Sequence, residues 1–502
     1  MIRVLSRASA LFATILLAAT TFAQVSFTHQ TYGTPNFPTD IFVADLNGDG
    51  KDDVVVTEED SNVVNVFLNH GDGTFTDQGS AQYLAGQNPE FVVVADINND
   101  GKPDIVTANG IACFNGAPPV VNLLLGNGDG TFQPPLETVL PGTGACISGL
   151  ALTKVNSANW DLAVSTAPND VRLLMNNGSG PFIVGNLVPG PSGLGNTTGT
   201  LSSADYNRDG HWDLAVNVFS DTGGSAIWEF LGDGTGHYTL QELFTPQQAA
   251  GGTNVFFSGP WTVDVNGDGI ADLLVPFDVS GTGTVTQGGV IVGINQGNGT
   301  FSHTTLRVNS RFAPLGKASE GDLNGDGFHD IILPVGVDPA NNNLPTFAFF
   351  RGIGKNAWAG AQYVHGNVGD NMEFTAVGQF VAGKTGFAGT GNANDLTVWE
   401  VGTAAPPPPP TCSVPTSAGV HVCSPAANAT VTSPVAISAA ANGGTKPITA
   451  MKAYIDGKQV AASSSASLKA SVAAGVGTHT LNVNAWNSAG TVFTFQSKFT
   501  VH

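Results

Sequence analysis

The chain has 502 residues, of which only 11% are charged, against about 25% in an average soluble domain. Acidic residues outnumber basic ones by 39 to 18, and the net charge of −21 excludes a protein that binds nucleic acid through its phosphates. The scarcity of charged helix formers also argues against a helix-rich fold, while a hydrophobic content of 41% is ample for packed cores.

The first 23 residues have the features of a secretory signal peptide. Arg3 and Arg7 precede an apolar stretch over residues 10–19, and small residues at Thr21 and Ala23 favour cleavage after Ala23. This stretch is shorter than the roughly 20 residues that a membrane span needs, and no later stretch reaches that length. We therefore expect a secreted protein, located outside the cell, on its surface or in the periplasm, with no membrane span.

A nine-residue acidic motif, Asp-x-Asn-x-Asp-Gly-x-x-Asp, recurs five times along the chain. Its copies begin at Asp45, Asp96, Asp205, Asp264 and Asp322, at intervals of 51, 109, 59 and 58 residues. A degenerate copy at 154–161 divides the double interval, and a second one lies near 378–387. Seven repeats of roughly 50 to 60 residues are typical of a propeller or a solenoid.

Each repeat contains the signals for four short strands. Apolar runs flank the acidic motif, a third run follows, and a Gly-rich turn leads to a fourth extended stretch. The turn recurs as Gly-Asp-Gly-Thr-Phe at 71–75 and 128–132 and as Gly-Asn-Gly-Thr-Phe at 297–301, and its Asp-Gly and Asn-Gly pairs supply the positive φ of tight hairpins. We predict an all-β fold, with a seven-bladed β-propeller over residues 24–402. The last repeat lacks a fourth strand, and we expect the strand at 25–32 to complete it and close the ring.

The acidic motif predicts calcium sites. Its positions 1, 3, 5 and 9 offer side-chain oxygens, position 7 offers a backbone carbonyl, and the glycine at position 6 permits a sharp turn, a pattern that suits Ca²⁺. The predicted ligands are Asp45, Asn47, Asp49, Lys51 and Asp53; Asp96, Asn98, Asp100, Lys102 and Asp104; Asp205, Asn207, Asp209, His211 and Asp213; Asp264, Asn266, Asp268, Ile270 and Asp272; and Asp322, Asn324, Asp326, Phe328 and Asp330.

The alternative, a set of solvated Asp-Gly turns, is disfavoured because five loops repeat the same ligand positions. An EF-hand is excluded because it requires an acid at position 12, where this chain has Val56, Thr107, Val216, Val275 and Leu333. The loops are therefore expected to join two strands and to stabilise the fold. We expect about five calcium ions, which would reduce the net charge to about −11.

The acidic loops, the Gly-Asp-Gly-Thr-Phe turns and the repeat length together resemble the FG-GAP/VCBS repeat family, the propeller type also found in integrin α subunits. The resemblance covers roughly residues 25–402. It implies calcium in the five loops, matched position by position. The third repeat has Lys154 at position 1 and keeps only Asn156 and Asp161, and the seventh has no recognisable site, so these two repeats depart from the family pattern.

The remainder of the chain predicts a second domain. Residues 403–411 form a proline-rich linker, and residues 412–502 contain short alternating runs and turns that indicate a β-sandwich. This segment resembles the bacterial Ig-like modules of secreted proteins. Four cysteines allow three pairings, and their separations favour Cys113–Cys146 and Cys412–Cys423 as structural disulfides.

No catalytic motif stands out in the sequence. It contains no Gly-x-Ser-x-Gly elbow, no His-Glu-x-x-His and no phosphate-binding loop. The architecture favours a monomeric binding or adhesion module for an extracellular glycan or protein ligand. The alternative is a hydrolase or lyase that acts on polysaccharide with acids at the rim of the propeller channel, among them Glu58, Glu59 and Asp60. Acids at this rim are also explained by the preference of aspartate for turns, and we prefer this explanation to a catalytic site.

Overall fold

The computed structural model confirms the all-β fold class and divides the chain into two compact units, residues 27–401 and residues 402–502 together with the N-terminal segment. The structure describes residues 26–34, 37–78, 83–109, 118–142, 146–156, 159–166, 170–178, 180–191, 197–219, 224–244, 255–281, 284–309, 314, 316–338, 344–365, 373–381, 383–391, 394–402, 412, 414–427, 429–431, 435–472, 474 and 477–501. The predicted signal peptide, the linker at 403–411 and Cys113 lie outside these residues. Among the described residues, no helix is long and apolar enough to cross a membrane.

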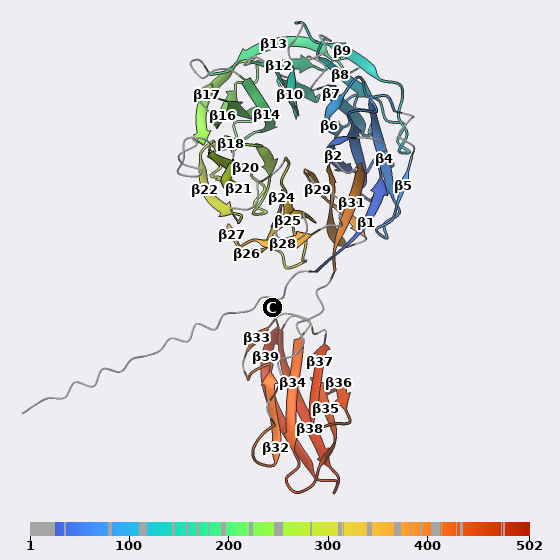
Figure 1. Cartoon of the computed structure of the whole chain (residues 1–502), viewed down its shortest axis with the longest axis vertical. Coiled ribbons are helices and arrows are strands. Elements are labelled where there is room, and N and C mark those ends of the chain that lie inside the picture. The colour runs from blue at the N-terminus through green and yellow to red at the C-terminus, as the bar shows by residue number, and fades with distance from the viewer. Residues whose placement is uncertain are drawn as a thin grey trace, which may run out of the picture. The chain divides into compact units, whose positions relative to one another are not determined.

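The unit of residues 27–401 consists of antiparallel sheets arranged around a central opening, as Figure 1 shows. Seven sheets of four or five strands are described in it. The first four comprise β2 (Pro38–Ala44), β3 (Asp53–Glu58), β4 (Val63–Asn69) and β5 (Phe75–Asp77); β6 (Pro89–Ala95), β7 (Asp104–Asn109), β8 (Val120–Leu124) and β9 (Leu136–Val139); β10 (Ile147–Thr153), β11 (Asp161–Thr166), β12 (Asp170–Met175) and β13 (Ile183–Pro189); and β14 (Thr197–Ala204), β15 (Asp213–Phe219), β16 (Ser225–Gly232) and β17 (Tyr238–Phe244).

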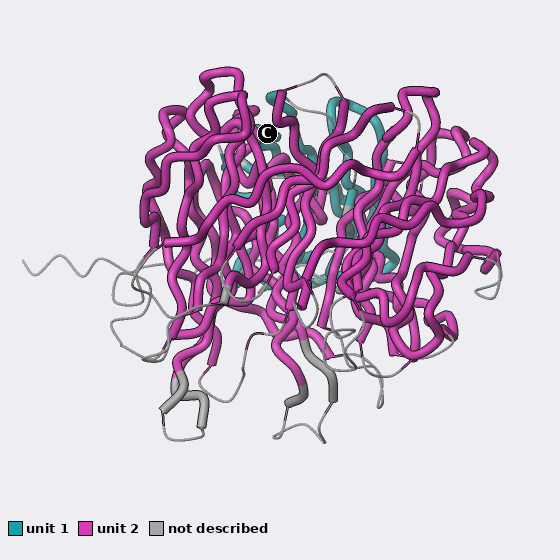
Figure 2. The backbone as a smooth tube through the Cα atoms, turned by 90° about the horizontal axis from the view of Figure 1, so that it is seen from above, with its two compact units in different colours: residues 1–26, 402–502 teal, residues 27–401 magenta. Residues whose placement is uncertain are grey.

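The remaining three sheets are less regular. They comprise β18 (Val255–Phe257), β19 (Trp261–Val263), β20 (Asp272–Gly281), β21 (Thr284–Asn295) and β22 (Phe301–Arg307); β23 (Ser319–Gly321), β24 (Asp330–Asp338), β25 (Leu344–Phe350) and β28 (Gln362–His365); and β29 (Phe374–Val381), β30 (Lys384–Gly391), β31 (Asp395–Gly402) and β1 (Ser26–Gly33). A small hairpin of β26 (Gly352–Gly354) and β27 (Ala357–Trp358) interrupts the sixth sheet before its last strand. Figure 2, turned by 90° from the view of Figure 1, shows that the strands run between the two faces of the ring.

The N-terminal strand closes the ring. β1 is the outer strand of the seventh sheet and is hydrogen-bonded to β31, so that the two ends of this unit share one sheet. Phe27 packs edge-on against Phe347 and Phe387, with ring centroids 5.3 and 6.0 Å apart, and thereby joins the sixth and seventh sheets. The ring is therefore closed by a sheet that contains strands from both ends of this unit, and the outer edge of β31 is paired.

The hydrophobic core consists of layers between neighbouring sheets. One cluster joins residues of the first and second sheets, such as Val66 and Val94, and another joins the fourth and fifth, such as Ile227 and Phe277. Because each sheet is covered on both faces, its second strand is mostly buried, and completely so in Asp53–Glu58, Asp104–Asn109 and Asp161–Thr166. Burial on both faces explains why the sequence of these strands is a nearly continuous apolar run and does not alternate.

The residues from 402 onward form a β-sandwich of two sheets. One contains β32 (Gly419–Ser424), β34 (Val435–Asn442) and β37 (Ser467–Val472), and the other contains β33 (Thr430–Val431), β39 (Val492–Val501), β38 (Gly477–Asn487), β35 (Ile448–Ile455) and β36 (Lys458–Ser463). Inward-facing residues of both sheets form its own core, including Ile437, Met451 and Val483. The sandwich therefore has the core of an independent domain.

Candidate functional site

The five acidic loops occupy equivalent places in the fold. Each joins the innermost strand of a sheet to its second strand, as the loop of residues 45–53 joins β2 to β3 and that of 322–330 joins β23 to β24. Since every sheet is traversed in the same order, all five loops lie on one face of the ring. Each loop directly follows a strand that lines the centre.

Positions 1, 3 and 5 turn their oxygens toward the backbone of the loop. In the first loop, Asp45 Oδ1 accepts hydrogen bonds from the amides of Gly48 (2.8 Å) and Asp49 (3.1 Å), and Asp45 Oδ2 accepts one from Gly50 (2.8 Å). Asn47 Oδ1 accepts a bond from Asp49 at 2.9 Å. The bonds from the position 5 amide to positions 1 and 3 recur in the other four loops, at Asp100, Asp209, Asp268 and Asp326.

The glycine at position 6 has a positive φ in every one of these loops, 79° at Gly50 and 82° at Gly101 for example, so the sharp turn depends on glycine. Its amide reaches position 1 in the same way at Gly101, Gly210, Gly269 and Gly327. The loop tips are exposed, and Lys51 Nζ lies 2.9 Å from Asp49 Oδ2. The oxygens of positions 1, 3 and 5 are thus gathered around one exposed turn.

Position 9 has a structural role that the sequence did not predict. In the first loop, the buried Asp53 carboxylate accepts the amide of Leu46 at 2.9 Å and the amide of Asn69, at the end of β4, at 2.8 Å. The same carboxylate therefore fastens the loop to the third strand of its sheet. An equivalent 2.8 Å bond, donated at or just after the end of the third strand, is present in the other four intact copies and in the degenerate copy at 154–161, from Gly126 to Asp104, Asn176 to Asp161, Gly232 to Asp213, Asn295 to Asp272 and Gly352 to Asp330.

The degenerate loop at 154–161 shows that the buried aspartate of position 9 has a role separate from that of the acids at positions 1 and 5. It has lost the acids of positions 1 and 5, yet Asp161 remains fully buried and accepts the amides of Val155 at 3.0 Å and Asn176 at 2.8 Å. We call this pair of bonds the aspartate clasp. Because the clasp persists where the acids of positions 1 and 5 are gone, it does not depend on those acids.

Burial perturbs the clasp carboxyls. It raises the pKa of Asp53 and Asp213 to about 6 and that of Asp272 and Asp330 to about 7, and the backbone amides that they accept oppose this shift. The nearby acids at positions 5 and 1 raise the pKa of Asp53 further. Negative charge is therefore concentrated at these loops, and a bound cation would relieve it.

A cavity of about 470 Å³ lies at the centre of the ring and is lined by the innermost strand of every sheet. Partly buried indole rings of Trp160, Trp212 and Trp261 contribute to its wall. The rings of Trp160 and Trp212 meet edge-to-face with centroids 5.3 Å apart. Each of these residues directly precedes the buried aspartate that ends its loop, Asp161 or Asp213, so the two loops place aromatic side chains at the cavity.

The charged residues in the cavity wall are paired. Lys317 Nζ donates to the carbonyl of Ile41 at 3.1 Å and lies 3.6 Å from Asp40 Oδ1. Glu320 Oε2 lies 2.5 Å from Nδ1 of His329. Burial raises the pKa of Asp40, although the Lys317 ammonium opposes this shift.

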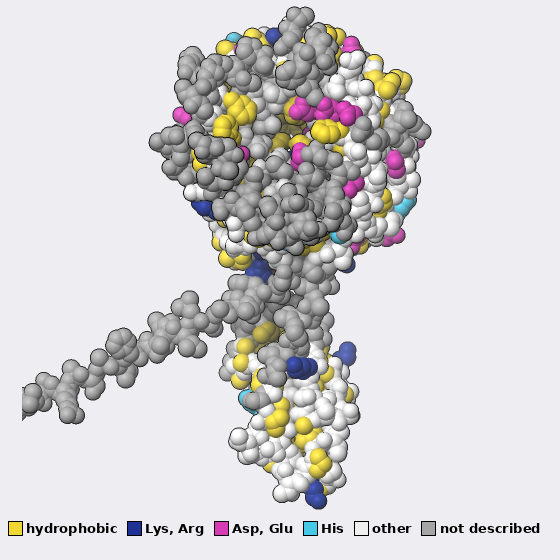
Figure 3. Space-filling view, in the orientation of Figure 1, with side chains coloured by type: hydrophobic (Ala, Val, Ile, Leu, Met, Phe, Trp, Pro, Cys, Tyr) yellow, Lys and Arg dark blue, Asp and Glu magenta, His cyan; other side chains and the backbone are white. Residues whose placement is uncertain are grey.

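Acidic side chains also gather beside the centre of the ring on the face seen in Figure 3. Burial raises the pKa of Glu90 to about 7, and the neighbouring carboxylates of Glu59 and Asp40 add to the effect. Burial and Asp60 likewise raise the pKa of Glu59. These groups include Glu59 and Asp60, two of the predicted rim acids, and the structure adds Glu90 to them.

We expect Glu90→Gln to stabilise the protein above neutral pH. The folded-state pKa of Glu90 lies above its ordinary value, so the folded state loses stability as pH rises from about 4.5 to about 7 and the carboxyl ionises. Above pH 7 the substitution should recover roughly 1–2 kcal/mol of unfolding free energy, and below pH 4.5 none. Denaturant unfolding at pH 4 and pH 8 measures this, with Glu137→Gln, an exposed position in the same sheet, as control; an equal effect at both pH values would contradict it.

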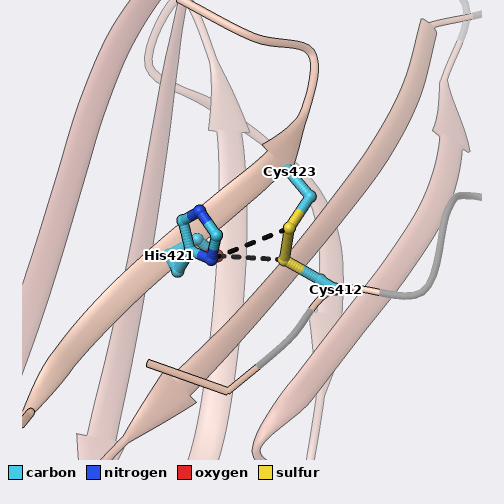
Figure 4. A group of neighbouring side chains, drawn as sticks. All are labelled: Cys412, His421 and Cys423. Atoms are coloured by element: carbon cyan, nitrogen blue, oxygen red, sulfur yellow. Dashed lines mark hydrogen bonds between the residues drawn. A yellow bond between two sulfur atoms is a disulfide. The ribbon is translucent and has the colours of Figure 1, made fainter. Parts of the chain in front are cut away.

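The predicted Cys412–Cys423 disulfide is present and fastens the start of the sandwich to β32, with a Cα–Cα distance of 5.6 Å. Figure 4 shows His421 beside it, with Nδ1 3.8 Å from Cys423 Sγ. These three side chains have the spacing of a metal site, but both sulfurs are occupied by their mutual bond. Cys146 is also disulfide-bonded, and its predicted partner Cys113 lies outside the described residues.

Together, the ring of sheets, the repeated acidic loops and the separate sandwich define an all-β repeat protein of the propeller class with an appended Ig-like domain. The profile of the FG-GAP-like repeat matches residues 23–107 and 205–275, and that of the bacterial Ig domain matches residues 419–483. The chain therefore carries FG-GAP-like repeats followed by a bacterial Ig domain, as its motifs predicted.

Solved structures resemble the chain at low sequence identity. The BBS1N chain, crystallised with ARL6DN and soaked with mercury, is 12% identical with a TM-score of 0.47, over 75% of this chain and 97% of its own. The Dos1 propeller is 9% identical with a TM-score of 0.42, over 74% and 95%. The extracellular domain of the one component system BT4673 from B. thetaiotaomicron is 11% identical with a TM-score of 0.42, over 93% and 57%. No curated protein matches the sequence.

Proposed function

We propose that this chain is a secreted calcium-binding repeat protein whose propeller binds an extracellular glycan or protein ligand. The observation that carries the calcium assignment is the repeated loop geometry, in which the oxygens of positions 1, 3 and 5 gather around one exposed glycine turn. All the donors are carboxylate, amide or carbonyl oxygens, the ligands that Ca²⁺ prefers.

The clasp is compatible with this assignment. Each oxygen of Asp53 accepts one backbone amide, and a carboxylate oxygen has a second lone pair that remains available to a cation. Side chains at positions 1, 3, 5 and 9 and the backbone carbonyl at position 7 would hold the ion. Its role in the proposal is to neutralise the loop carboxylates and stiffen the turns on one face of the ring, so that the ligand-binding surface is held in place.

Ligand binding is tested with a glycan array probed by the full chain, once with calcium and once after chelation. We expect saturable binding to a limited set of glycans and its loss on chelation, because the loops support the walls of the cavity. Binding that survives chelation would restrict calcium to a role in stability. Failure to bind any glycan, together with failure to bind calcium, would overturn the proposed function.

A further inference from the structure

The chemistry of the central cavity narrows the class of ligand that fits it. Its volume of about 470 Å³ falls within the range of roughly 300–1,000 Å³ typical of small-molecule sites. Its wall combines apolar strand residues and indole rings with the hydroxyl groups of serine and threonine side chains. Such a wall is suited to a ligand with both apolar faces and hydroxyl groups.

The charges in the wall do not require a charged ligand. Among the described residues that line the cavity, the ionisable side chains are Asp40, Lys317 and Glu320. Asp40 and Lys317 neutralise each other, and Glu320 Oε2 lies 2.5 Å from His329 Nδ1, an ion pair when the imidazole is protonated, although neither of these two atoms has a hydrogen bond of normal geometry. An ionic ligand would have to break one of these pairs, whereas a neutral one leaves them intact.

The neutral polar groups, in contrast, include two without a partner in the described part of the chain. Nε1 of Trp261 and Oγ1 of Thr200 are both buried, both belong to residues that line the cavity, and neither has a hydrogen-bond partner there. A buried polar atom without a partner is destabilising, and a ligand that meets these two groups when the Trp261 and Thr200 side chains turn toward the cavity would supply the missing partners.

The indole rings provide the complementary apolar surface. Trp212 and Trp160 stand perpendicular to each other, and Lys154 Nζ lies 4.4 Å from the ring centroid of Trp160. Lys154 already covers one face of Trp160. A substitution of Trp212 therefore tests the contact between a ligand and an indole ring most directly. The pyranose ring of a sugar has an apolar C–H face for such a surface and hydroxyls for Trp261 and Thr200.

We propose that the central cavity binds one or two terminal rings of a neutral glycan, stacked on Trp212 and hydrogen-bonded to Trp261 and Thr200. This inference rests on the proposed function, since it assigns the ligand class and the place where the ligand binds. It excludes uronic acids, sulfated sugars and cationic ligands as the preferred class.

The test uses the full chain and the strongest neutral oligosaccharide from the array, titrated by calorimetry. We expect Trp212→Ala to weaken binding about tenfold or more and Trp261→Phe, which keeps an aromatic ring but removes the N–H group, to weaken it several-fold. Trp486→Phe, in the sandwich, is the matched control and should leave the affinity unchanged. Circular dichroism establishes that each variant is folded.

A second measurement observes the cavity with all of its side chains in place. With 5-fluorotryptophan incorporated, the ¹⁹F resonances of Trp212 and Trp261 should shift on saturation with the oligosaccharide, while that of Trp486 should not. Glycan binding that leaves these resonances and the affinity of Trp212→Ala unchanged would overturn the cavity assignment but not the proposed function. Preferential binding of acidic or basic glycans would overturn the neutral class. Calcium binding without any glycan binding would overturn this inference alone.

Discussion

Removal of calcium is expected to lower the thermal midpoint of the propeller unit by on the order of 5–15 °C. Extracellular calcium modules bind with dissociation constants of about 10⁻⁴ to 10⁻³ M. At a calcium concentration ten times the dissociation constant, each site contributes about 1.4 kcal/mol, and five sites about 7 kcal/mol. The physical reason is that the ion offsets repulsion among loop carboxylates, of which those at position 9 are buried. Calorimetric scans with calcium and with a chelator measure the shift.

The control for this prediction is the Ig-like sandwich, which has none of the acidic loops, so its own transition should not move. A single-site variant, Asp49→Ala, should remove one of about five binding events in a calcium titration and reduce the shift by about a fifth. An identical midpoint with and without calcium, or a magnesium effect of equal size, would contradict the calcium assignment.

Asp161→Ala is expected to destabilise the propeller by roughly 2–5 kcal/mol, whether or not calcium is present. The substitution removes both acceptors of the clasp and leaves the buried amides of Val155 and Asn176 unpaired, at about 1–3 kcal/mol each. The degenerate loop lacks the acids of positions 1 and 5, so no calcium is expected to bind there and the loss should be the same in chelator. Denaturant unfolding with and without calcium gives both values.

Asp60→Ala provides the control, since Asp60 is exposed and lies on the opposite face of the ring. Asp161→Asn should fall between the two, because an amide oxygen replaces only one of the two acceptors. A loss for Asp161→Ala that appears only with calcium would show that the position 9 aspartate acts through the metal alone.

The architecture of the ring could be predicted from sequence because short sequence motifs mark the turns between its strands. The acidic motifs mark the turns between first and second strands, and the Gly-Asp-Gly-Thr-Phe turns mark later hairpins; Gly71 and Gly73 indeed have φ values of 78° and 85°. The Ig-like sandwich was recognised from alternation and turn spacing in the same way. The β26–β27 hairpin was not anticipated, because a two-residue strand such as Ala357–Trp358 has no periodicity to detect.

The clasp and the cavity could not be predicted, because both depend on which residues of distant segments meet. Asp53 was identified as a ligand by its spacing, but the amide of Asn69 that it accepts lies in another strand. No local pattern marks Trp160, Trp212 and Trp261 as neighbours, and the structure places all three at the central cavity. The partnership of Asp40 with Lys317 joins the first and sixth sheets, a contact that no local pattern contains.

The pairing of β1 with β31 has a consequence for the order of folding. Ser26–Gly33 is the first strand of this unit to be synthesised, and its partner Asp395–Gly402 is the last. The first strand must therefore remain without its partner until the whole ring has been made, and the final hydrogen bonds form between segments separated by almost the entire unit. During that interval the seventh sheet is open to any other extended chain, including β1 of a second copy, so domain exchange at this seam is the characteristic assembly error to which the fold is exposed.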